Sequence, residues 1–238
     1  MKKLSLFLVL LFFFQILNAQ FGISAGYKPI TAKNWERVIG EHPSNLSGNE
    51  SNESFANGIH LGVDYWFRLK NYRVEFVPEL SFSRFTRIYT LGEGKEDFFN
   101  AQFLGLHFNT NFYILDLKGD CDCPTFSKEG NSLEKGFFIQ LAPGVDYIFN
   151  SYKTDGNSQK ANDIVPSVGI GIGIDFGLND LLTVTPMVKI HHYFNAEWEG
   201  LNTIYEPTKL ISEDLNTNNV TQLFAGLRIG LRLDSDKY

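Results

Sequence analysis

Apolar residues alternate with small or polar residues in eight segments of the chain. In the sixth segment, VPSVGIGIGIDFG at residues 165–177, Val168, Ile170 and Ile172 are each followed by a glycine. Alternation with a period of two residues over this length predicts β-strands and not helices. The eight segments span residues 21–29, 57–68, 72–85, 103–115, 136–149, 165–177, 182–194 and 221–233.

The lengths of these segments and of the connections between them indicate a membrane barrel. Many segments reach about ten residues, and a tilted strand needs about nine to eleven residues to cross a membrane. Residues 28–56, 150–164 and 195–219 are long polar connections, whereas residues 69–71 and 178–181 are tight turns. Outer-membrane barrels have this pattern of long outer loops and short periplasmic turns. The connection at residues 116–135 is the exception, because it is long but falls on the periplasmic side.

The second face of each segment combines glycine with ionisable residues of both signs. The interior of an eight-stranded barrel is just wide enough to be filled by its own side chains, so long charged side chains need glycine opposite them. We therefore expect this face to line the lumen and the apolar face to meet lipid. A soluble lipocalin-like barrel has the two faces exchanged, and apolar side chains packed inside the barrel would favour that alternative. The ionisable residues expected in the lumen are Arg73, Glu75, Glu79, His107, Asp146, Asp175, Lys189, His191, Arg228 and Arg232.

The N-terminus and the composition predict where the protein is located. Residues 1–19 resemble a secretory signal peptide, with basic Lys2 and Lys3, an apolar stretch and small Ala19 at the expected cleavage point. An uncleaved anchor is the alternative, but the apolar stretch is short for a spanning helix. Residues 20–238 then form one barrel domain in the outer membrane. The net charge of −6 argues against a nucleic-acid partner, and the mean hydropathy of −0.14 is compatible with a barrel because its strands are only weakly hydrophobic.

With these features the chain resembles the small outer-membrane β-barrel proteins of Bacteroidetes, the broad PorT-like group. The resemblance rests on LNAQ at residues 17–20, the eight alternating segments, and LFAGLRIGLRL at residues 223–233. It covers most of the mature chain and is architectural, because no short motif identifies one member. Some members of the group serve the type IX secretion machinery, so the resemblance implies a role in secretion or assembly. It assigns no functional residue.

Two interpretations of the ionisable lumen residues remain open. They could line a narrow pore for ions or small solutes, or they could pair with one another and fill the lumen. Pairing is favoured, because an unpaired buried charge is very costly and eight strands leave little open bore.

Cys121 and Cys123 are the most distinctive residues of the connection at 116–135. A disulfide suits an oxidising compartment, but a bridge between residues i and i+2 would be strained. The acidic connection could instead be a docking loop for a periplasmic or outer-membrane protein, and both interpretations stay open. Two thiolates are too few for a zinc site, and His191 and His192 point to opposite faces of a strand. We therefore expect no metal and no cofactor.

A barrel-embedded hydrolase would need a serine beside a histidine and a carboxylate. Ser81 and Ser83 could meet His107 across neighbouring strands, but strands supply serine and histidine often by chance. The chain has no GxSxG motif, and we do not expect an enzyme.

The sequence therefore predicts an all-β fold, an eight-stranded antiparallel up-and-down transmembrane β-barrel with long outer loops. The expected function is that of a non-catalytic membrane scaffold or an accessory subunit of a secretion or assembly complex. Its expected partners are outer-membrane lipid and a protein bound through residues 116–135. A narrow pore and a barrel-embedded hydrolase are the alternatives.

Overall fold

Eight long β-strands form the structure, and each contains one of the alternating segments or most of it. The computed structural model describes residues 20–40, 56–69, 72–90, 96–116, 135–154, 157–179, 181–201 and 216–232. The long strands are β1 (Gln20–Tyr27), β3 (Asn57–Tyr65), β5 (Val74–Thr90), β6 (Glu96–Phe112), β7 (Phe137–Thr154), β8 (Asn157–Ile174), β10 (Leu182–Glu197) and β11 (Thr217–Arg232). The shorter elements are β2 (Ile30–Thr31), helix α2 (Lys33–Gly40), β4 (Phe67–Arg68), the 3₁₀ helix η3 (Ile114–Asp116) and β9 (Phe176–Gly177). Within the described residues, no helix is both long enough and apolar enough to cross a membrane.

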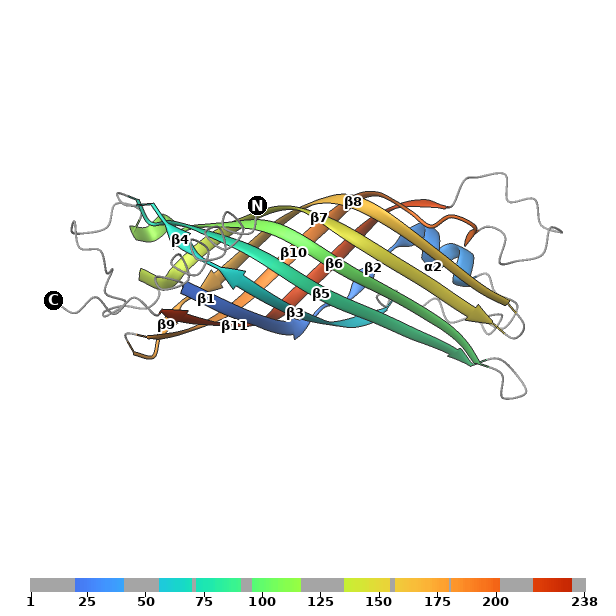
Figure 1. The fold of residues 1–238 in the computed structure, drawn as a ribbon, viewed down its shortest axis with the longest axis horizontal. Helices are drawn as coiled ribbons and strands as arrows, with labels where there is room; N and C mark the ends of the chain where they lie inside the picture. Colours follow the sequence, from blue (N-terminus) through green and yellow to red (C-terminus); the bar gives the residue numbers. More distant parts are fainter. Residues whose placement is uncertain are drawn as a thin grey trace, which may run out of the picture.

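The long strands close into a barrel in chain order (Figure 1). Each pairs antiparallel with the next, and β11 pairs with both β10 and β1, which closes the ring. This topology confirms the predicted up-and-down barrel of eight strands. Gln20 pairs with Arg232 at one end of the barrel. We call this end the inner end and the opposite end the outer end.

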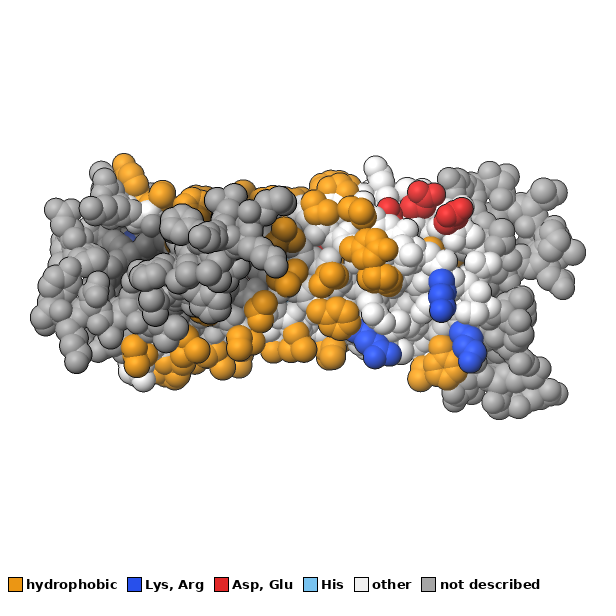
Figure 2. Space-filling view, in the orientation of Figure 1, with side chains coloured by type: hydrophobic (Ala, Val, Ile, Leu, Met, Phe, Trp, Pro, Cys, Tyr) orange, Lys and Arg blue, Asp and Glu red, His pale blue; other side chains and the backbone are white. Residues whose placement is uncertain are grey.

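A belt of large apolar side chains covers the outward face of the barrel (Figure 2). On β8, Val168, Ile170 and Ile172 are 38%, 60% and 52% exposed. On β7 the belt runs from Phe137 to Phe149, which is roughly 30 Å along the barrel axis for a strand tilted by about 40°. The hydrocarbon core of a bilayer is also about 30 Å thick, so the belt has the dimensions of a lipid-facing surface.

The glycines of β8 lie on the inner face, against long side chains of the neighbouring strand β10. A Cβ atom on Gly169 would overlap the ring of His191, and a Cβ atom on Gly171 would lie 2.6 Å from Cγ of Lys189. The side chains of His191 and Lys189 therefore occupy the space that the glycines leave free, which confirms the predicted orientation of the two faces of this strand.

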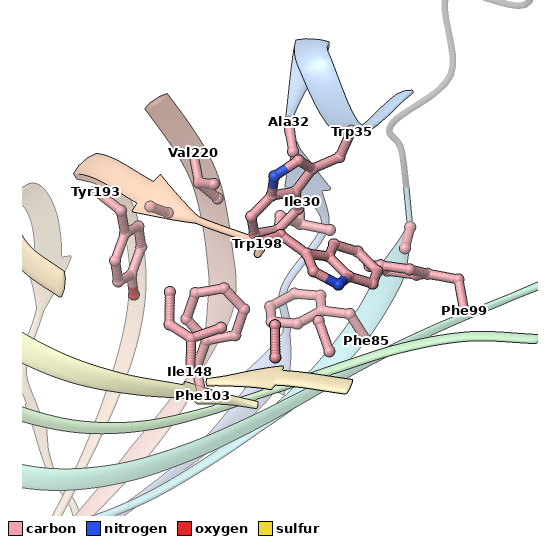
Figure 3. Close-up of a cluster of buried hydrophobic side chains, with 14 of the residues drawn as sticks. Ile30, Ala32, Trp35, Phe85, Phe99, Phe103, Ile148, Tyr193, Trp198 and Val220 are labelled. Carbon is pink, nitrogen blue, oxygen red and sulfur yellow. The ribbon is translucent and has the colours of Figure 1, made fainter. Parts of the chain in front are cut away.

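Beyond the belt, at the outer end, the interior becomes apolar. Phe99 on β6 and Ile148 on β7 are completely buried there. Trp35 from α2 and Trp198 from the residue after β10 turn into the barrel mouth, where their rings meet edge to face with centroids 5.4 Å apart (Figure 3). We call this cluster the outer plug. It consists of Ile30, Ala32, Trp35, Ala56, Phe85, Phe99, Ala101, Phe103, Ile148, Tyr152, Ala161, Val165, Tyr193, Ala196, Trp198, Leu201 and Val220.

The outer plug does not make the fold a soluble barrel. Among the described residues, the buried apolar side chains gather in the plug and in a second cluster of Tyr113, Phe138, Met187 and Phe224, and Trp66, Val74, Val77 and Ala142 are buried outside both clusters. The lumen between these clusters is polar, and the wall outside it carries the apolar belt. A soluble barrel with exchanged faces would have neither feature.

The sequence pattern predicts a long loop over residues 150–164, and this prediction is wrong. β7 and β8 continue as a paired hairpin up to the pair Thr154 and Asn157. The apolar alternation ends below this hairpin, because outward positions such as Lys160 lie past the belt and are polar. The hairpin is held instead by inward side chains such as Tyr152, which is buried in the outer plug.

Candidate functional site

Glu79 on β5 is the centre of a buried polar network that joins five strands. Its Oε2 accepts hydrogen bonds from Nζ of Lys189 on β10 at 3.1 Å and from Nδ2 of Asn109 on β6 at 2.8 Å. Its Oε1 accepts a hydrogen bond from Oγ of Ser24 on β1 at 2.6 Å and lies 3.4 Å from Nε2 of His60 on β3. Glu79 and Lys189 are only 2% and 3% exposed. Because an unpaired buried charge is very costly, each holds the other in place.

A second buried pair lies closer to the outer plug. Nε2 of His107 on β6 is 2.9 Å from Oδ2 of Asp146 on β7, which also accepts a hydrogen bond from Oγ of Ser167 at 3.1 Å. The ring of His191 on β10 stacks beside His107, with centroids 4.8 Å apart. These groups continue the polar filling from the Glu79 network towards the plug.

The inner end of the lumen holds a third polar group. Arg228 on β11 forms a two-pronged ion pair with Asp64 on β3, at 2.8 and 2.5 Å. The hydroxyl of Tyr113 lies 2.6 Å from Oδ2 of Asp175 and 2.8 Å from Oε2 of Glu75. Two-pronged arginine–carboxylate pairs are among the stronger charged hydrogen bonds. Together with the Tyr113, Asp175 and Glu75 group, the Arg228–Asp64 pair fills this end of the lumen.

The structure places most of the predicted lumen residues inside the barrel. Eight of them are buried there: Arg73, Glu79, His107, Asp146, Asp175, Lys189, His191 and Arg228. Glu75 is half-buried at the inner end. The side chain of Arg232 lies outside the described part of the chain, as do Cys121, Cys123 and the signal peptide at residues 1–19.

Several residues of these polar groups are absent from the predicted lumen set, among them Ser24, Lys28, His60 and Asp64. Ser24, His60 and Asp64 follow the inward parity of their strands, so alternation could have found them. Lys28 has the same parity as Ser24 and lies in the segment 21–29, but it follows the end of β1, and residues 28–56 are expected to form a connection. It is nevertheless 1% exposed, and its Nζ lies 3.3 Å from Oγ of Ser83.

Ser81, His107 and Asp146 lie in the order of a catalytic triad. Oγ of Ser81 is 3.4 Å from Nδ1 of His107, whose Nε2 is bonded to Asp146. A nucleophilic serine must also be reached by its substrate. Ser81 is only 3% exposed inside the barrel wall, and His107 and Asp146 are 1% exposed. The arrangement therefore satisfies buried polar groups and presents no exposed nucleophile.

Together, the closed register, the apolar belt and the filled polar lumen define the chain as an eight-stranded transmembrane β-barrel. No family model and no curated protein matches the sequence. Among solved structures, the chain is similar to a major outer membrane protein from Thermus thermophilus, with 15% identity, a TM-score of 0.47 and coverage of 90% of this chain and 99% of that one. It is also similar to Ail, the attachment invasion locus protein of Yersinia pestis, with 13% identity, a TM-score of 0.44 and coverage of 90% and 99%. Neisserial surface protein A is similar at 6% identity, with a TM-score of 0.44 and coverage of 90% and 97%.

Proposed function

We propose that the protein is a closed, non-catalytic barrel of the outer membrane that acts as a membrane scaffold. It holds its outer hairpins and loops at the cell surface and does not conduct. The observation that carries this proposal is the filled lumen, in which the Glu79–Lys189 network is followed outwards by the apolar plug. The outer membrane is its expected location because closed β-barrels with an apolar belt are the typical spanning structures there.

The filled lumen argues against the narrow pore. An ion in transit must stay hydrated or exchange its water for polar groups, and the outer plug presents apolar side chains around the barrel mouth. Below the plug, Lys189 and Glu79 satisfy each other, so neither offers a free charge to a passing ion. The buried position of Ser81 likewise argues against the hydrolase.

Conductance of the purified barrel in a planar bilayer tests the proposal. We expect no conductance steps under conditions in which an open porin, inserted in parallel, gives regular steps. A heat-dependent shift in gel mobility would establish that the inserted protein is a folded barrel. Regular steps of one size from the folded barrel would contradict the closed lumen.

An accessory role in a secretion or assembly complex is the more specific part of the proposal, and it is supported by the sequence alone. The acidic connection at residues 116–135 is the proposed contact with a protein partner. Affinity purification from the outer-membrane fraction should recover a partner in near-stoichiometric amount, and deletion of residues 117–134 should abolish its recovery. The variant Cys121→Ser/Cys123→Ser is the matched control that separates a disulfide-stapled loop from a docking loop. Recovery of the barrel alone would contradict the accessory role but not the closed lumen.

A further inference from the structure

Lys28 is a buried cation whose side chain meets no carboxylate among the described residues. It directly follows β1, is only 1% exposed, and reaches across the lumen, where its Nζ donates to Oγ of Ser83 on β5 at 3.3 Å. The ion pairs of the described lumen residues within 4 Å do not include it. An ammonium carries three N–H groups, so two of them have no acceptor. Because an unpaired buried charge is very costly, this ammonium requires a further, negatively charged acceptor.

The carboxylates in this part of the lumen are engaged by other donors. Oε1 and Oε2 of Glu79 both accept hydrogen bonds, and Oε2 also forms the ion pair with Lys189. Oδ2 of Asp146 lies 2.9 Å from Nε2 of His107, and its Oδ1 lies 3.5 Å from the hydroxyl of Tyr193. Neither carboxylate is therefore the direct acceptor that the ammonium lacks.

Two more buried side chains without hydrogen-bond partners lie beside Lys28. Gln222 on β11 pairs with Ile30, two residues after Lys28, and on its other side with His191 on β10. Gln222 is completely buried, and its Oε1 accepts from the hydroxyl of Tyr193 at 3.0 Å, but its Nε2 has no partner. His191 is 2% exposed, and neither of its ring nitrogens has a partner. The three side chains occupy neighbouring inward positions directly beneath the outer plug, to which Ile30 and Tyr193 belong.

The chemistry of these groups favours an anion over a cation or a water molecule. Nζ of Lys28 and Nε2 of Gln222 are donors only, and the charge of Lys28 repels a cation. A water molecule also has to donate its own hydrogens, and neither of these two nitrogens can accept them. A single ammonium balances a single negative charge. The side chains of Lys28, Gln222 and His191 are at most 2% exposed, so an anion held among them has to be small.

We propose that Lys28, Gln222 and His191 hold a small monovalent anion of the halide type, buried beneath the outer plug. The anion neutralises the ammonium of Lys28 and accepts the N–H groups that the protein leaves unpaired. It therefore stabilises the folded barrel. The site depends on these donors and not on whether the lumen excludes ions from one side to the other, so anion binding and conductance can fail independently.

Unfolding of the full-length barrel by urea in lipid vesicles, at a constant ionic strength, tests this inference. Sodium chloride is exchanged stepwise for sodium gluconate, whose anion is too large for a site enclosed by buried side chains. Above the dissociation constant, a tenfold rise in chloride should raise the ratio of folded to unfolded protein about tenfold, because the ion binds the folded state alone. Lys28→Met should remove this dependence. A native barrel that is equally stable in both salts would overturn the proposal.

Two variants separate the site from general salt effects and from misfolding. Gln222→Glu places a carboxylate of the same shape beside Lys28 and keeps the acceptor for Tyr193. This variant should be independent of chloride and at least as stable in gluconate as the native barrel. Lys160→Met removes an exposed cation on β8 and should keep the full chloride dependence. Chloride dependence that persists in folded Lys28→Met or Gln222→Glu would contradict the assignment of the site.

Anomalous diffraction from crystals of the native barrel, refolded in sodium bromide, locates the ion without any substitution. We expect a bromide peak within hydrogen-bonding reach of Nζ of Lys28 and Nε2 of Gln222. Density for water at that position, or bromide bound only elsewhere, would overturn the proposal even if every variant failed to fold.

Discussion

The inward glycines of β8 are explained at the scale of single residues by what lies opposite them. Replacing glycine by alanine usually stabilises a protein by about 0.4–1 kcal/mol when the backbone allows it, because the unfolded chain loses entropy. At Gly169 the new methyl group would overlap the ring of His191. We therefore expect Gly169→Ala to lower the free energy of unfolding by about 1–3 kcal/mol, as overpacking does. Urea-induced unfolding of the barrel in lipid vesicles measures this change.

Two variants control for that prediction. At Gly230 the added methyl group would lie 2.9 Å from Nη1 of Arg228, whose Nε and Nη2 bond Asp64, so Gly230→Ala should cost less than Gly169→Ala. In the double variant Gly169→Ala/His191→Ala the clash is gone, and the two substitutions should not be additive. Additive losses in the double variant would show that the imidazole is not the obstacle.

The pair of Glu79 and Lys189 gives a second test at the residue scale. Glu79→Gln leaves the buried Lys189 ammonium without its carboxylate, so we expect a loss of about 3–5 kcal/mol. Glu79→Gln/Lys189→Met removes both charges and should recover much of that loss. The same unfolding measurement decides between the two outcomes. If the double variant is the least stable, the two charges do not depend on one another.

At the scale of strands, the sequence predicts the membrane-level parts well and the outer parts poorly. Within the belt, alternation is strict because one face meets lipid and the other meets polar groups, as at Ile170 and Gly171. Past the belt neither face keeps its type of side chain, so the alternating pattern is lost although the strand continues. β6 begins at Glu96, whereas the alternating pattern begins at residue 103. The alternation is lost because the strand passes from lipid into water while its pairing with the neighbouring strands continues.

This change of solvent along β8 predicts opposite responses to the same substitution. Ile170→Arg puts a charge on the lipid face within the belt and should cost about 2–4 kcal/mol if the position is near the bilayer midplane. Asn162→Arg has the same outward orientation on the same strand but lies past the belt, so it should cost about 0–1 kcal/mol. Refolding of the two variants into vesicles, followed by urea unfolding, measures both costs. Equal costs would mean that the belt does not mark the position of the bilayer.

At the scale of the whole molecule, the contents of the lumen could be predicted from the sequence, but their pairing could not. Parity alone identifies Glu79 and Lys189 as inward residues. Their contact depends on barrel closure, which brings β5 and β10 to face each other across the interior. The outer plug was missed for a related reason, since Trp35 and Trp198 come from stretches that read as loops. Their burial follows from the barrel mouth that they close.

The outer plug and the Glu79–Lys189 network lie one behind the other along the barrel axis, and this arrangement predicts how the barrel would open. Trp35→Ala/Trp198→Ala shortens the plug but leaves the Glu79–Lys189 network in place, so we expect this variant to stay closed. Glu79→Ala/Lys189→Ala removes the central ion pair but leaves the plug, and it should stay closed as well. Only the variant with all four substitutions has a lumen that water can enter from both sides, and it should give conductance steps in a planar bilayer. Conductance by either double variant would show that the filling which it retains does not close the lumen by itself. A folded quadruple variant without conductance would show that the remaining side chains, such as His107 and Asp146, still block the lumen.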